Sequence, residues 1–474
     1  MLFTSATFLF VFLPAVLLLY FTARGTFLRN LVLLLASVVF YIWGELSHAW
    51  IIGLLILVNY ISAIAIDRCN QPATKRIILL TACAVNLAAL LRFKYAFFFT
   101  EIWNGLAKDI SLPLLAVKQH ALPLGISFFV FHCISYLVDI HRGRAKAQKD
   151  PIKMALYIAL FPQLIAGPII RFSQICDQFT TRQVDSEKFA LGVRRFLIGL
   201  GKKMILANSF AVPADAIFAL DSKFLNPDVA WLGAIAYTLQ LYFDFSGYSD
   251  MAIGLAHMFG FTFPENFNYP YISQTVREFW QRWHITLSGW FRDYVYIPMG
   301  GNQHGQARTA ANLLIVFLLC GLWHGANWTF IAWGLFHGFF LSLERIGLAS
   351  LLNRLDQPFR HAYTLLVVIV GWVFFRSESL EKAFAHLRAM WTWQPAAIGA
   401  PELSRFLTSE LVVLLFLGAI VSTPVLQFCK SKTIQFIDPL LIKTGQTIFL
   451  LSVLCLSIAE VSAGSYNPFI YFHF

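Results

Sequence analysis

A histidine inside an apolar segment is the residue of this chain best suited to carry out chemistry. His324 lies in the run GLWHGANW, and apolar residues continue on both sides of it. A histidine at membrane depth is costly, so it faces a bundle interior or a water-filled cavity and marks a candidate functional site. A neutral imidazole titrates at about pH 6.5 and can therefore take a proton from a hydroxyl group and return it later. The alternative is that His324, like His337 further along, only packs between helices.

The neighbours of His324 favour the functional interpretation. Asn327 follows three positions later and would share nearly the same face of a continuous helix. Its amide could hydrogen-bond an imidazole or a substrate carbonyl, or donate to a developing oxyanion. Gly321 and Gly325 would let other backbones approach closely. We therefore expect His324 to be the base and Asn327 to be a candidate oxyanion donor.

The stretch from 241 to 302 is the densest polar segment of the chain. Residues 273–296 have helical spacing, with Trp280 and His284 four positions apart. We predict a helical segment in the membrane interface, with rings at headgroup depth and arginines on the aqueous side. Guanidinium groups there would suit a phosphate-rich carrier, whereas the simpler interpretation is an interfacial anchor. The candidates for substrate contacts are Asp244, Ser246 and Tyr248, and those for donor binding are Arg277, Arg282, Arg292 and Trp283.

Motifs for several other chemistries are missing from the sequence. It contains no GxSxG elbow, no Walker loop, no GxGxxG turn and no HExxH pair. Its seven cysteines are scattered singly without a CxxC pair, so neither a metal site nor a disulfide framework is expected. Proton transfer by histidine is the best-supported chemistry.

The composition indicates an integral membrane protein. Hydrophobic residues make up 58% of the 474 and charged residues 13%, against about 25% charged in soluble domains. Several apolar blocks reach the roughly 20 residues that are needed to cross a bilayer. We predict an all-α polytopic protein with about a dozen transmembrane helices and some re-entrant and interfacial helices. The expected spans lie near 3–21, 28–44, 49–66, 77–91, 122–140, 154–170, 228–245, 310–330, 332–348, 362–375, 410–428 and 446–463, with further buried helix in 189–220 and 248–263.

The net charge of +11 reflects membrane topology rather than nucleic-acid binding. Basic residues cluster in short connections after the first, third and fifth expected spans, at 24–29, 68–76 and 142–153. The positive-inside rule places these connections in the cytoplasm and the N-terminus outside. There they can also contact anionic lipid. The sequence has no internal repeat and no extended soluble segment, so we expect residues 1–474 to form a single membrane domain.

Three runs of the sequence carry a family resemblance. LYFDFSGYSDMAIGL, PENFNYPYISQTVREFWQRWHITLSGWFRDYVYIPMGGN and GLWHGANWTFIAWGLFHG resemble the core signatures of the membrane-bound O-acyltransferase family, in its bacterial branch. LPLGISFFVFHCISYLVDIHRG and FPQLIAGPIIRF agree with this resemblance. It covers a core of about residues 1–345, whereas residues 346–474 match less distinctively. It is strongest to the members that serve alginate O-acetylation.

The resemblance implies a central tunnel through the membrane. The family's histidine corresponds to His324, and its second, more variable polar position corresponds to His284. Acetyl-CoA would be the cytoplasmic donor substrate, and no bound cofactor is expected. The acetyl group would cross the bacterial inner membrane to the periplasmic side, where partner acetyltransferase proteins or the polysaccharide itself would accept it.

Three alternatives stay open at this point. Relatives in the same branch acetylate cellulose or peptidoglycan, so the acceptor could be either polymer. A transporter or flippase could use Asp244 and Asp250 as ion or proton sites, although no matched pair of broken helices supports it. A docking subunit could merely scaffold periplasmic acetyltransferases.

Overall fold

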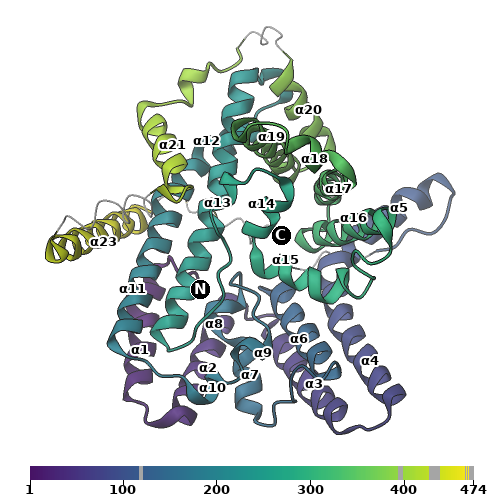
Figure 1. Ribbon diagram of the computed structural model, residues 1–474, viewed down its shortest axis with the longest axis vertical. Helices are drawn as coiled ribbons and strands as arrows, with labels where there is room; N and C mark the ends of the chain where they lie inside the picture. The colour runs from purple at the N-terminus through teal and green to yellow at the C-terminus, as the bar shows by residue number, and fades with distance from the viewer. Residues whose placement is uncertain (117–120, 393–398, 426–437, 465, 467, 469–474) are drawn as a thin grey trace. The chain divides into compact units, whose positions relative to one another are not determined.

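The computed structural model describes residues 1–116, 121–392, 399–425, 438–464, 466 and 468. These residues form helices joined by connections, with no strand among them, which confirms the predicted all-α class (Figure 1). The chain divides into two compact units. The first comprises Met1–Val193 and Ala252–Pro264, and the second comprises Arg194–Met251 and Glu265–Phe474.

The first unit consists of apolar helices and their connections. In chain order they are η1 (Phe8–Phe12), α1 (Leu13–Thr22), α2 (Gly25–Gly44), α3 (Ala49–Arg68), α4 (Pro72–Leu90), η2 (Leu91–Tyr95), α5 (Ala96–Asp109), α6 (Ile126–His141), α7 (Pro151–Ala159), α8 (Phe161–Leu164), α9 (Phe172–Ile175), α10 (Gln178–Thr181), the first part of α11 (Ser186–Gly201) and the last part of α13 (Pro227–Met258). Asn59 on α3 and Asn86 on α4 are buried and donate to each other's side-chain oxygens at 3.0 and 3.1 Å. Such amide pairs satisfy polar groups where no water is available.

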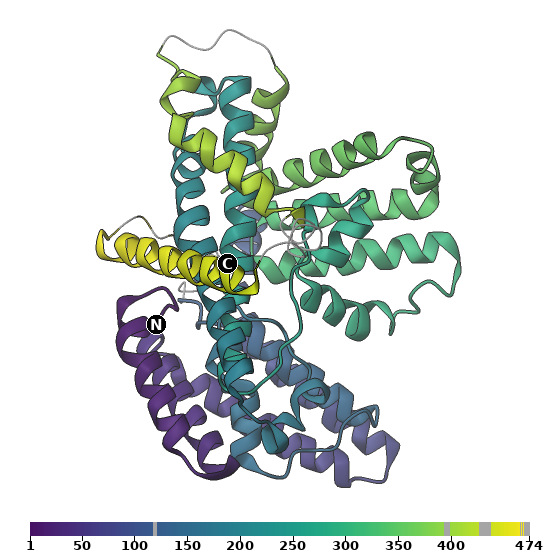
Figure 2. The ribbon, with the colours of Figure 1, turned by 60° about the vertical axis from the view of Figure 1, so that its left-hand side comes forward.

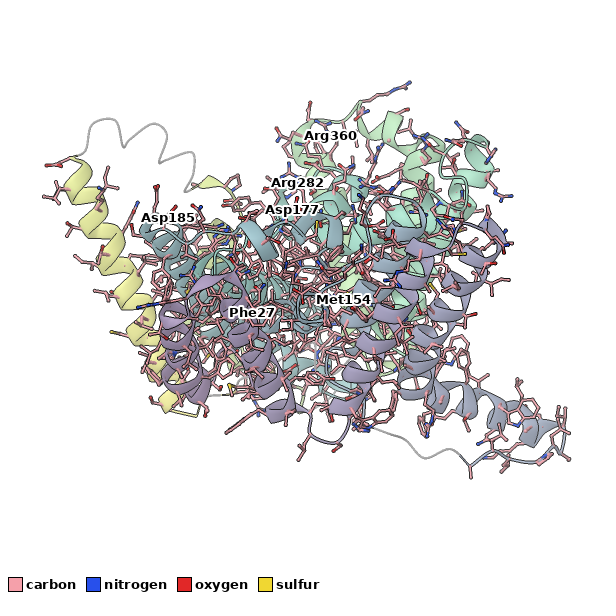
Figure 3. All side chains as sticks on the ribbon, turned by 90° about the horizontal axis from the view of Figure 1, so that it is seen from below. Phe27, Met154, Asp177, Asp185, Arg282 and Arg360 are labelled. Carbon is pink, nitrogen blue, oxygen red and sulfur yellow. The ribbon has the colours of Figure 1, made fainter. Side chains whose placement is uncertain are left out.

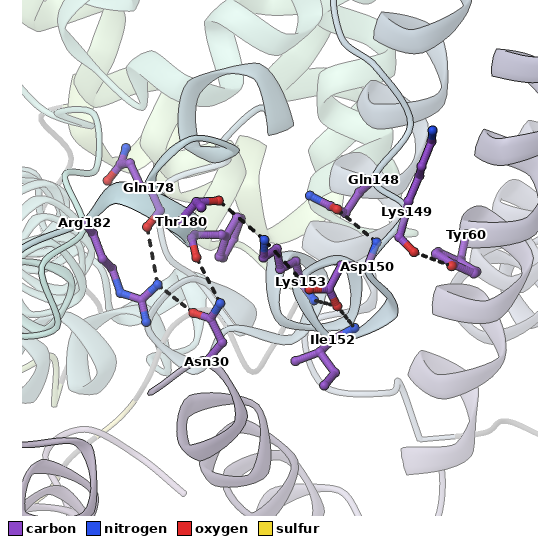
Figure 4. Close-up of polar contacts among 11 residues, drawn as sticks. Asn30, Tyr60, Gln148, Lys149, Asp150, Ile152, Lys153, Gln178, Thr180 and Arg182 are labelled. Carbon is purple, nitrogen blue, oxygen red and sulfur yellow. Dashed lines mark hydrogen bonds and ion pairs between the residues drawn. The ribbon is translucent and has the colours of Figure 1, made fainter. Parts of the chain in front are cut away.

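Polar contacts hold the connections of the first unit in place (Figure 4). Arg182 donates to the Asn30 side chain at 2.6 Å, which attaches the end of α10 to α2. The Tyr60 hydroxyl on α3 donates to the Lys149 carbonyl oxygen at 2.7 Å. Asp150 caps the start of α7 by accepting from two backbone N–H groups. The basic connection 142–153 is therefore tied to α3 and α7 by specific hydrogen bonds.

The block expected as a span at 154–170 is not a continuous helix, so that part of the prediction is wrong. α7 ends at Ala159, and the buried backbone from 165 to 171 is largely non-helical. Non-helical backbone at membrane depth is tolerated only when protein groups satisfy it. Here the Ile170 N–H donates to Nε2 of buried His132 at 3.1 Å, and the Phe161 N–H donates to Ser37 at 3.1 Å. This segment has the character of a re-entrant piece.

The second unit holds the residues singled out for chemistry. Its helices are the rest of α11, η3 (Lys202–Ala207), α12 (Asn208–Phe218), η4 (Ser222–Phe224), most of α13, η5 (Pro270–Ile272), α14 (Val276–Arg282), α15 (Ile285–Phe291), η6 (Arg292–Tyr296), α16 (Gly305–His324), α17 (Trp328–Leu343), η7 (Glu344–Leu348), α18 (Ala349–Leu352), α19 (Gln357–Arg376), α20 (Leu380–Trp391), η8 (Leu403–Arg405), α21 (Ser409–Val421) and α23 (Pro439–Ser462). α16 and α17 run side by side (Figures 1 and 2). A Cβ atom on Gly321 would collide with the Phe330 backbone, and one on Gly334 would collide with the Phe317 backbone. The predicted close approach at Gly321 is confirmed, whereas Gly325 faces the Phe330 ring.

Seven helical segments of the described chain are long and apolar enough to cross a bilayer. They are Gly25–Gly44, Ala49–Arg68, Pro72–Asp109, Gly305–His324, Trp328–Leu352, Gln357–Arg376 and Leu440–Ser462. Shorter apolar helices cover Phe8–Thr22, Ile126–His141 and Ser409–Val421, and the 32-residue α13 continues well beyond the expected 228–245. The part of the expected span 410–428 after residue 425 lies outside the described residues. The chain is thus a multi-pass membrane protein.

Candidate active site

His284 lies at a break between two short helices rather than inside one. α14 ends at Arg282, α15 begins at Ile285, and His284 has a left-handed backbone with φ of 43° and ψ of 55°. The expected continuous helix, with Trp280 and His284 on one face, is therefore wrong. A left-handed conformation costs a residue other than glycine about 1–3 kcal/mol and occurs disproportionately at functional sites. The backbone at His284 is accordingly held by its surroundings.

Asn266 organises this break. Its side-chain oxygen accepts from the Thr286 N–H at 3.2 Å and from the Thr286 hydroxyl at 2.8 Å. Its side-chain nitrogen donates to the Ser249 hydroxyl on α13 at 3.1 Å. The Ile285 N–H donates to the Asn266 carbonyl oxygen at 2.9 Å, so backbone and side chain together fix the turn. Sequence reasoning missed Asn266, although it lies among the polar residues of the PENFNYP run.

The same amide sets the protonation of His284. Its Nδ1 lies 3.0 Å from the side-chain oxygen of Asn266, which can only accept, so Nδ1 carries the proton. Nε2 then presents a lone pair, and this buried atom has no hydrogen-bond partner within the described chain. Burial lowers the pKa of His284 to about 3, which keeps the imidazole neutral. His284 is thus an oriented, unprotonated nitrogen in an apolar environment.

His324 is the last residue of α16 and is enclosed by aromatic rings. Its ring centroid lies 4.9 Å from that of Trp323, 5.0 Å from Trp333 and 5.1 Å from Phe375. The Trp323 ring also contacts the His284 ring at 6.3 Å. The two histidines that sequence reasoning selected therefore share one tryptophan as a neighbour, although they are far apart in the chain.

Asn327 does not continue the helix of His324, so the expectation of a shared helical face is wrong. The helix ends at His324, and Asn327 is the N-cap of α17, where its side-chain oxygen accepts from the Thr329 N–H at 3.1 Å. Its side-chain nitrogen donates to the Glu378 carbonyl oxygen at 3.0 Å. Gly325 interrupts the helix with an extended backbone. Asn327 thus joins α17 to the end of α19. Phe375, near that end of α19, contacts His324.

A cavity of about 740 Å³ lies along α16. Polar and apolar side chains from α14 to α18 line it, and the arginines among them are Arg277, Arg292 and Arg345. Its wall includes Cys320, which precedes His324 by four residues and so lies on the same helical face. The cavity therefore extends to within one helical turn of the candidate base. Within the described chain, Glu344 is the only carboxylate in its wall.

Two of the four predicted donor-binding residues line this cavity, and two lie elsewhere. Arg277 and Arg292 are in its wall. Arg282, labelled in Figure 3, forms an ion pair with Glu278 at 2.9 Å and donates to the Asn268 carbonyl oxygen. Trp283 is buried among other rings, 4.9 Å from Trp372. Sequence reasoning missed Arg345, because it follows an apolar helix without any motif.

The predicted substrate-contact residues Asp244, Ser246 and Tyr248 lie on α13, and a residue between them, Phe245, contacts His284. The Phe245 ring packs edge-on against the His284 ring at 4.7 Å. Asp244 forms a buried ion pair with Lys203 at 2.7 Å. Ser246 and Tyr248 are buried as well, and the Ser246 hydroxyl has no hydrogen-bond partner in the described part of the chain. Sequence reasoning missed Lys203, although a lysine pair inside the apolar stretch 189–220 was a visible signal.

Asp250 belongs to a second ion network. It accepts from Arg195 at 2.7 Å and from Lys202 at 2.7 Å, and Arg195 also binds both oxygens of Glu265. These neighbours raise the pKa of Arg195 against the opposing effect of burial. The network attaches α11 to α13. No group of three or more metal-ligating side chains occurs among the residues that were described, and Cys429 lies outside them.

Comparison with known proteins agrees with this geometry. The profile of the membrane-bound O-acyltransferase family matches residues 56–376, which is more than half of the chain. The chain belongs to this family. It is therefore an acyltransferase, and the match extends beyond residue 345 to include Phe375, which contacts His324.

Individual relatives of this O-acyltransferase cover between about half and all of its length. It is 43% identical to the probable alginate O-acetylase AlgI of Pseudomonas putida, with all of both chains covered. It is 34% identical to the peptidoglycan O-acetyltransferase of Helicobacter pylori, over all of this chain and 98% of the relative. It is 30% identical to the teichoic acid D-alanyltransferase of Bacillus subtilis, over 54% of this chain and 65% of the relative.

Proposed function

We propose that this membrane O-acyltransferase takes an acetyl group from cytoplasmic acetyl-CoA and passes it across the bacterial inner membrane for O-acetylation of an alginate-type polysaccharide. The observation that carries the proposal is the arginine-lined cavity that ends one helical turn from His324. The names of the full-length relatives, which are alginate and peptidoglycan O-acetylating proteins, support the reaction class.

The cavity is suited to an anionic thioester donor. Its volume falls within the range of about 300–1,000 Å³ typical of small-molecule sites. Guanidinium groups bind phosphate oxygens in bidentate fashion, and Arg277, Arg292 and Arg345 supply three of them. The apolar wall formed by Leu313, Val316 and Phe317 would accommodate the less polar arm that carries the thioester. In this arrangement the acyl end would point toward His324.

The proposed chemical step requires one base and no resident cofactor. The His324 imidazole removes the proton from an acceptor hydroxyl as its oxygen bonds to the thioester carbon. The tetrahedral intermediate collapses, the C–S bond breaks, and the imidazolium returns the proton to the leaving thiolate. Before this step, His284, whose proton is on Nδ1, accepts from the same hydroxyl through Nε2 and so holds it in place until its proton passes to His324. General base catalysis of this kind contributes roughly 10²- to 10⁴-fold.

The acceptor is proposed from the relatives' names. A periplasmic acetyltransferase partner, or the polysaccharide itself, would receive the acetyl group on the far side of the membrane. The alginate acetylases favour an alginate-type polymer, whereas the peptidoglycan relative keeps peptidoglycan as the runner-up, alongside cellulose. The ion pairs of Asp244 with Lys203 and of Asp250 with Lys202 give both carboxylates fixed cationic partners, so they do not favour the transporter alternative.

The decisive experiment is acetyl transfer in proteoliposomes that contain the purified protein and labelled acetyl-CoA. His324→Ala should abolish transfer while the detergent-solubilised protein still elutes as a single folded species. His337→Asn is the matched control, because it removes another buried imidazole but keeps an acceptor for the Trp280 N–H. It should retain activity.

Three results would overturn the proposal. Undiminished transfer by His324→Ala would remove the base from the mechanism. Polymer acetylation that persists in cells carrying His324→Ala would favour a docking subunit without catalysis. Movement of a substrate across the bilayer without covalent transfer would favour the transporter.

A further inference from the structure

Glu344 is a buried carboxylate that joins three elements around the cavity. It begins η7 directly after α17, its side chain is 6% exposed, and it lies in the cavity wall. Oε1 accepts from the Val276 N–H at 2.7 Å, and Oε2 accepts from the Arg277 N–H at 3.0 Å. The Tyr363 hydroxyl on α19 also donates to Oε1, at 3.3 Å. One side chain thus connects α14, the end of α17 and α19.

These contacts satisfy the first turn of α14. The first N–H groups of a helix have no partner inside it, and burying them unpaired is costly. Glu344 takes the N–H groups of Val276 and Arg277, and the Thr275 hydroxyl takes that of Glu278 at 3.0 Å. The negative carboxylate also lies at the positive end of the helix. The position and direction of α14 therefore depend on Glu344.

The position of α14 in turn shapes the cavity. Arg277 and Trp280 project from α14 into the cavity wall. Trp280 also donates to His337 at 3.4 Å and stacks edge-on against Phe317 at 5.0 Å, so it forms a rigid partition between cavity and core. α14 has only seven residues and few internal hydrogen bonds of its own. The hydrogen bonds from Val276 and Arg277 to Glu344, called the Glu344 clamp below, consequently hold these two side chains in place.

We propose that Glu344 is a positioning residue for the donor site, which rests on the proposed function of that cavity. It holds the start of α14 so that Arg277 meets the anionic part of the donor and Trp280 closes the wall. It does this as an acceptor of backbone N–H groups, and it does not itself bind the donor.

The test uses variants that separate the clamp from the charge. Glu344→Gln keeps the length of the side chain but can accept only through one oxygen. Glu344→Asp keeps the charge but withdraws both oxygens by one methylene group. The clamp predicts that both variants raise the KM for acetyl-CoA by about tenfold, while kcat changes by less than about twofold. A direct electrostatic contact predicts the opposite for Glu344→Gln, because removing a negative charge from an anion site lowers KM.

A second measurement reports on the cavity without any turnover. Cys320 lies in the cavity wall, so the rate at which N-ethylmaleimide modifies it, followed by mass spectrometry of its peptide, reports on how closed the wall is. Both Glu344 variants should raise this rate by about tenfold. Cys69, in the connection after α3, is the internal reference and should be unaffected. Tyr363→Phe removes one contact and leaves both backbone contacts, so it should have a smaller effect on both measurements.

Each outcome decides the matter. A lower KM in Glu344→Gln, or an unchanged KM together with an unchanged Cys320 rate, would overturn the clamp. The clamp would also be overturned if Glu344→Gln failed to fold and Tyr363→Phe matched wild type in both KM and the Cys320 rate. If wild-type protein transfers no acetyl group, the proposed function fails, and the Cys320 rates alone decide whether Glu344 holds α14.

Discussion

Replacing His284 by asparagine should remove its chemistry without disturbing the fold. The amide nitrogen of asparagine would stand where Nδ1 stands and could donate to Asn266 in its place, while Nε2 would be lost. Asparagine also tolerates the left-handed backbone of this position, φ of 43°, better than most residues. The variant exchanges one buried acceptor without a partner, Nε2, for another, the amide oxygen, so the cost of about 1–3 kcal/mol for such a group is little changed. The unfolding temperature of His284→Asn in detergent should therefore stay close to that of wild type.

The effect on catalysis should be confined to the chemical step. A neutral hydrogen bond that positions the reacting hydroxyl is worth about 0.5–1.5 kcal/mol, so kcat/KM should fall roughly 2- to 13-fold. The KM for acetyl-CoA should stay near the wild-type value, since other residues line the cavity proposed to bind the donor. Initial rates of acetyl transfer in proteoliposomes measure both parameters.

The pH dependence and a double variant sharpen this test. Because burial holds the pKa of His284 near about 3, its nitrogen stays unprotonated through the working range, and the acid limb of the kcat/KM profile should be the same in His284→Asn. Asn266→Ala should lose activity by freeing the imidazole, and it should lower kcat/KM by a smaller factor in the His284→Asn background than in wild type, because part of its effect passes through the His284–Asn266 pair. Wild-type kcat/KM in a well-folded His284→Asn protein would refute the reasoning.

Three further predictions concern charged and titratable residues. Arg277→Ala should raise the KM for acetyl-CoA about tenfold, whereas Arg282→Ala, a change on the same helix but outside the cavity, should leave this KM unchanged. Equal changes of KM in the two variants would contradict the proposed donor site. Asp244→Asn should lower the free energy of unfolding by about 3–5 kcal/mol in chemical denaturation, because the change leaves the Lys203 ammonium group buried without its carboxylate. The double variant Asp244→Asn, Lys203→Met should regain most of the lost free energy of unfolding. Burial lowers the pKa of His386 to about 4, so its contribution to stability is complete above about pH 6.5 and is lost as the pH falls from 6.5 toward 4. In thermal unfolding, the unfolding temperature of His386→Gln should therefore fall less steeply with pH over that window than that of wild type. Equal slopes of unfolding temperature against pH in the two proteins would refute the assignment.

The membrane fold could be predicted from the sequence because it depends on local composition. Long apolar blocks must cross a bilayer wherever they lie in the chain, so α2, α3, α16, α17 and α19 appear where the blocks predicted them. A histidine within such a block is costly, which marked His324 as the candidate base. Both inferences need only the residue types and their order.

Breaks in the helices could not be predicted from spacing. Periodicity suggested one helix through His284 and a second through Asn327, yet both helices end beside these residues. The stretch 154–170 was apolar enough for a span, but it contains prolines and a glycine, and a distant group, His132, satisfies the N–H of Ile170 in its non-helical part. Tertiary hydrogen bonds outweigh a local pattern at such positions.

What the sequence by itself determined is that this is a helical membrane acyltransferase, and it also proposed His324 and His284 as the residues of its site. Only the tertiary structure decided how these histidines are held and what surrounds them. Asn266 fixes the protonated nitrogen of His284, Lys203 neutralises Asp244, and the cavity selects Arg277 and Arg292 but not Arg282. Each of these outcomes depends on a partner remote in the chain or on the direction of a side chain. Neither can be read from residue types in order, because only the packed structure brings such groups within bonding distance.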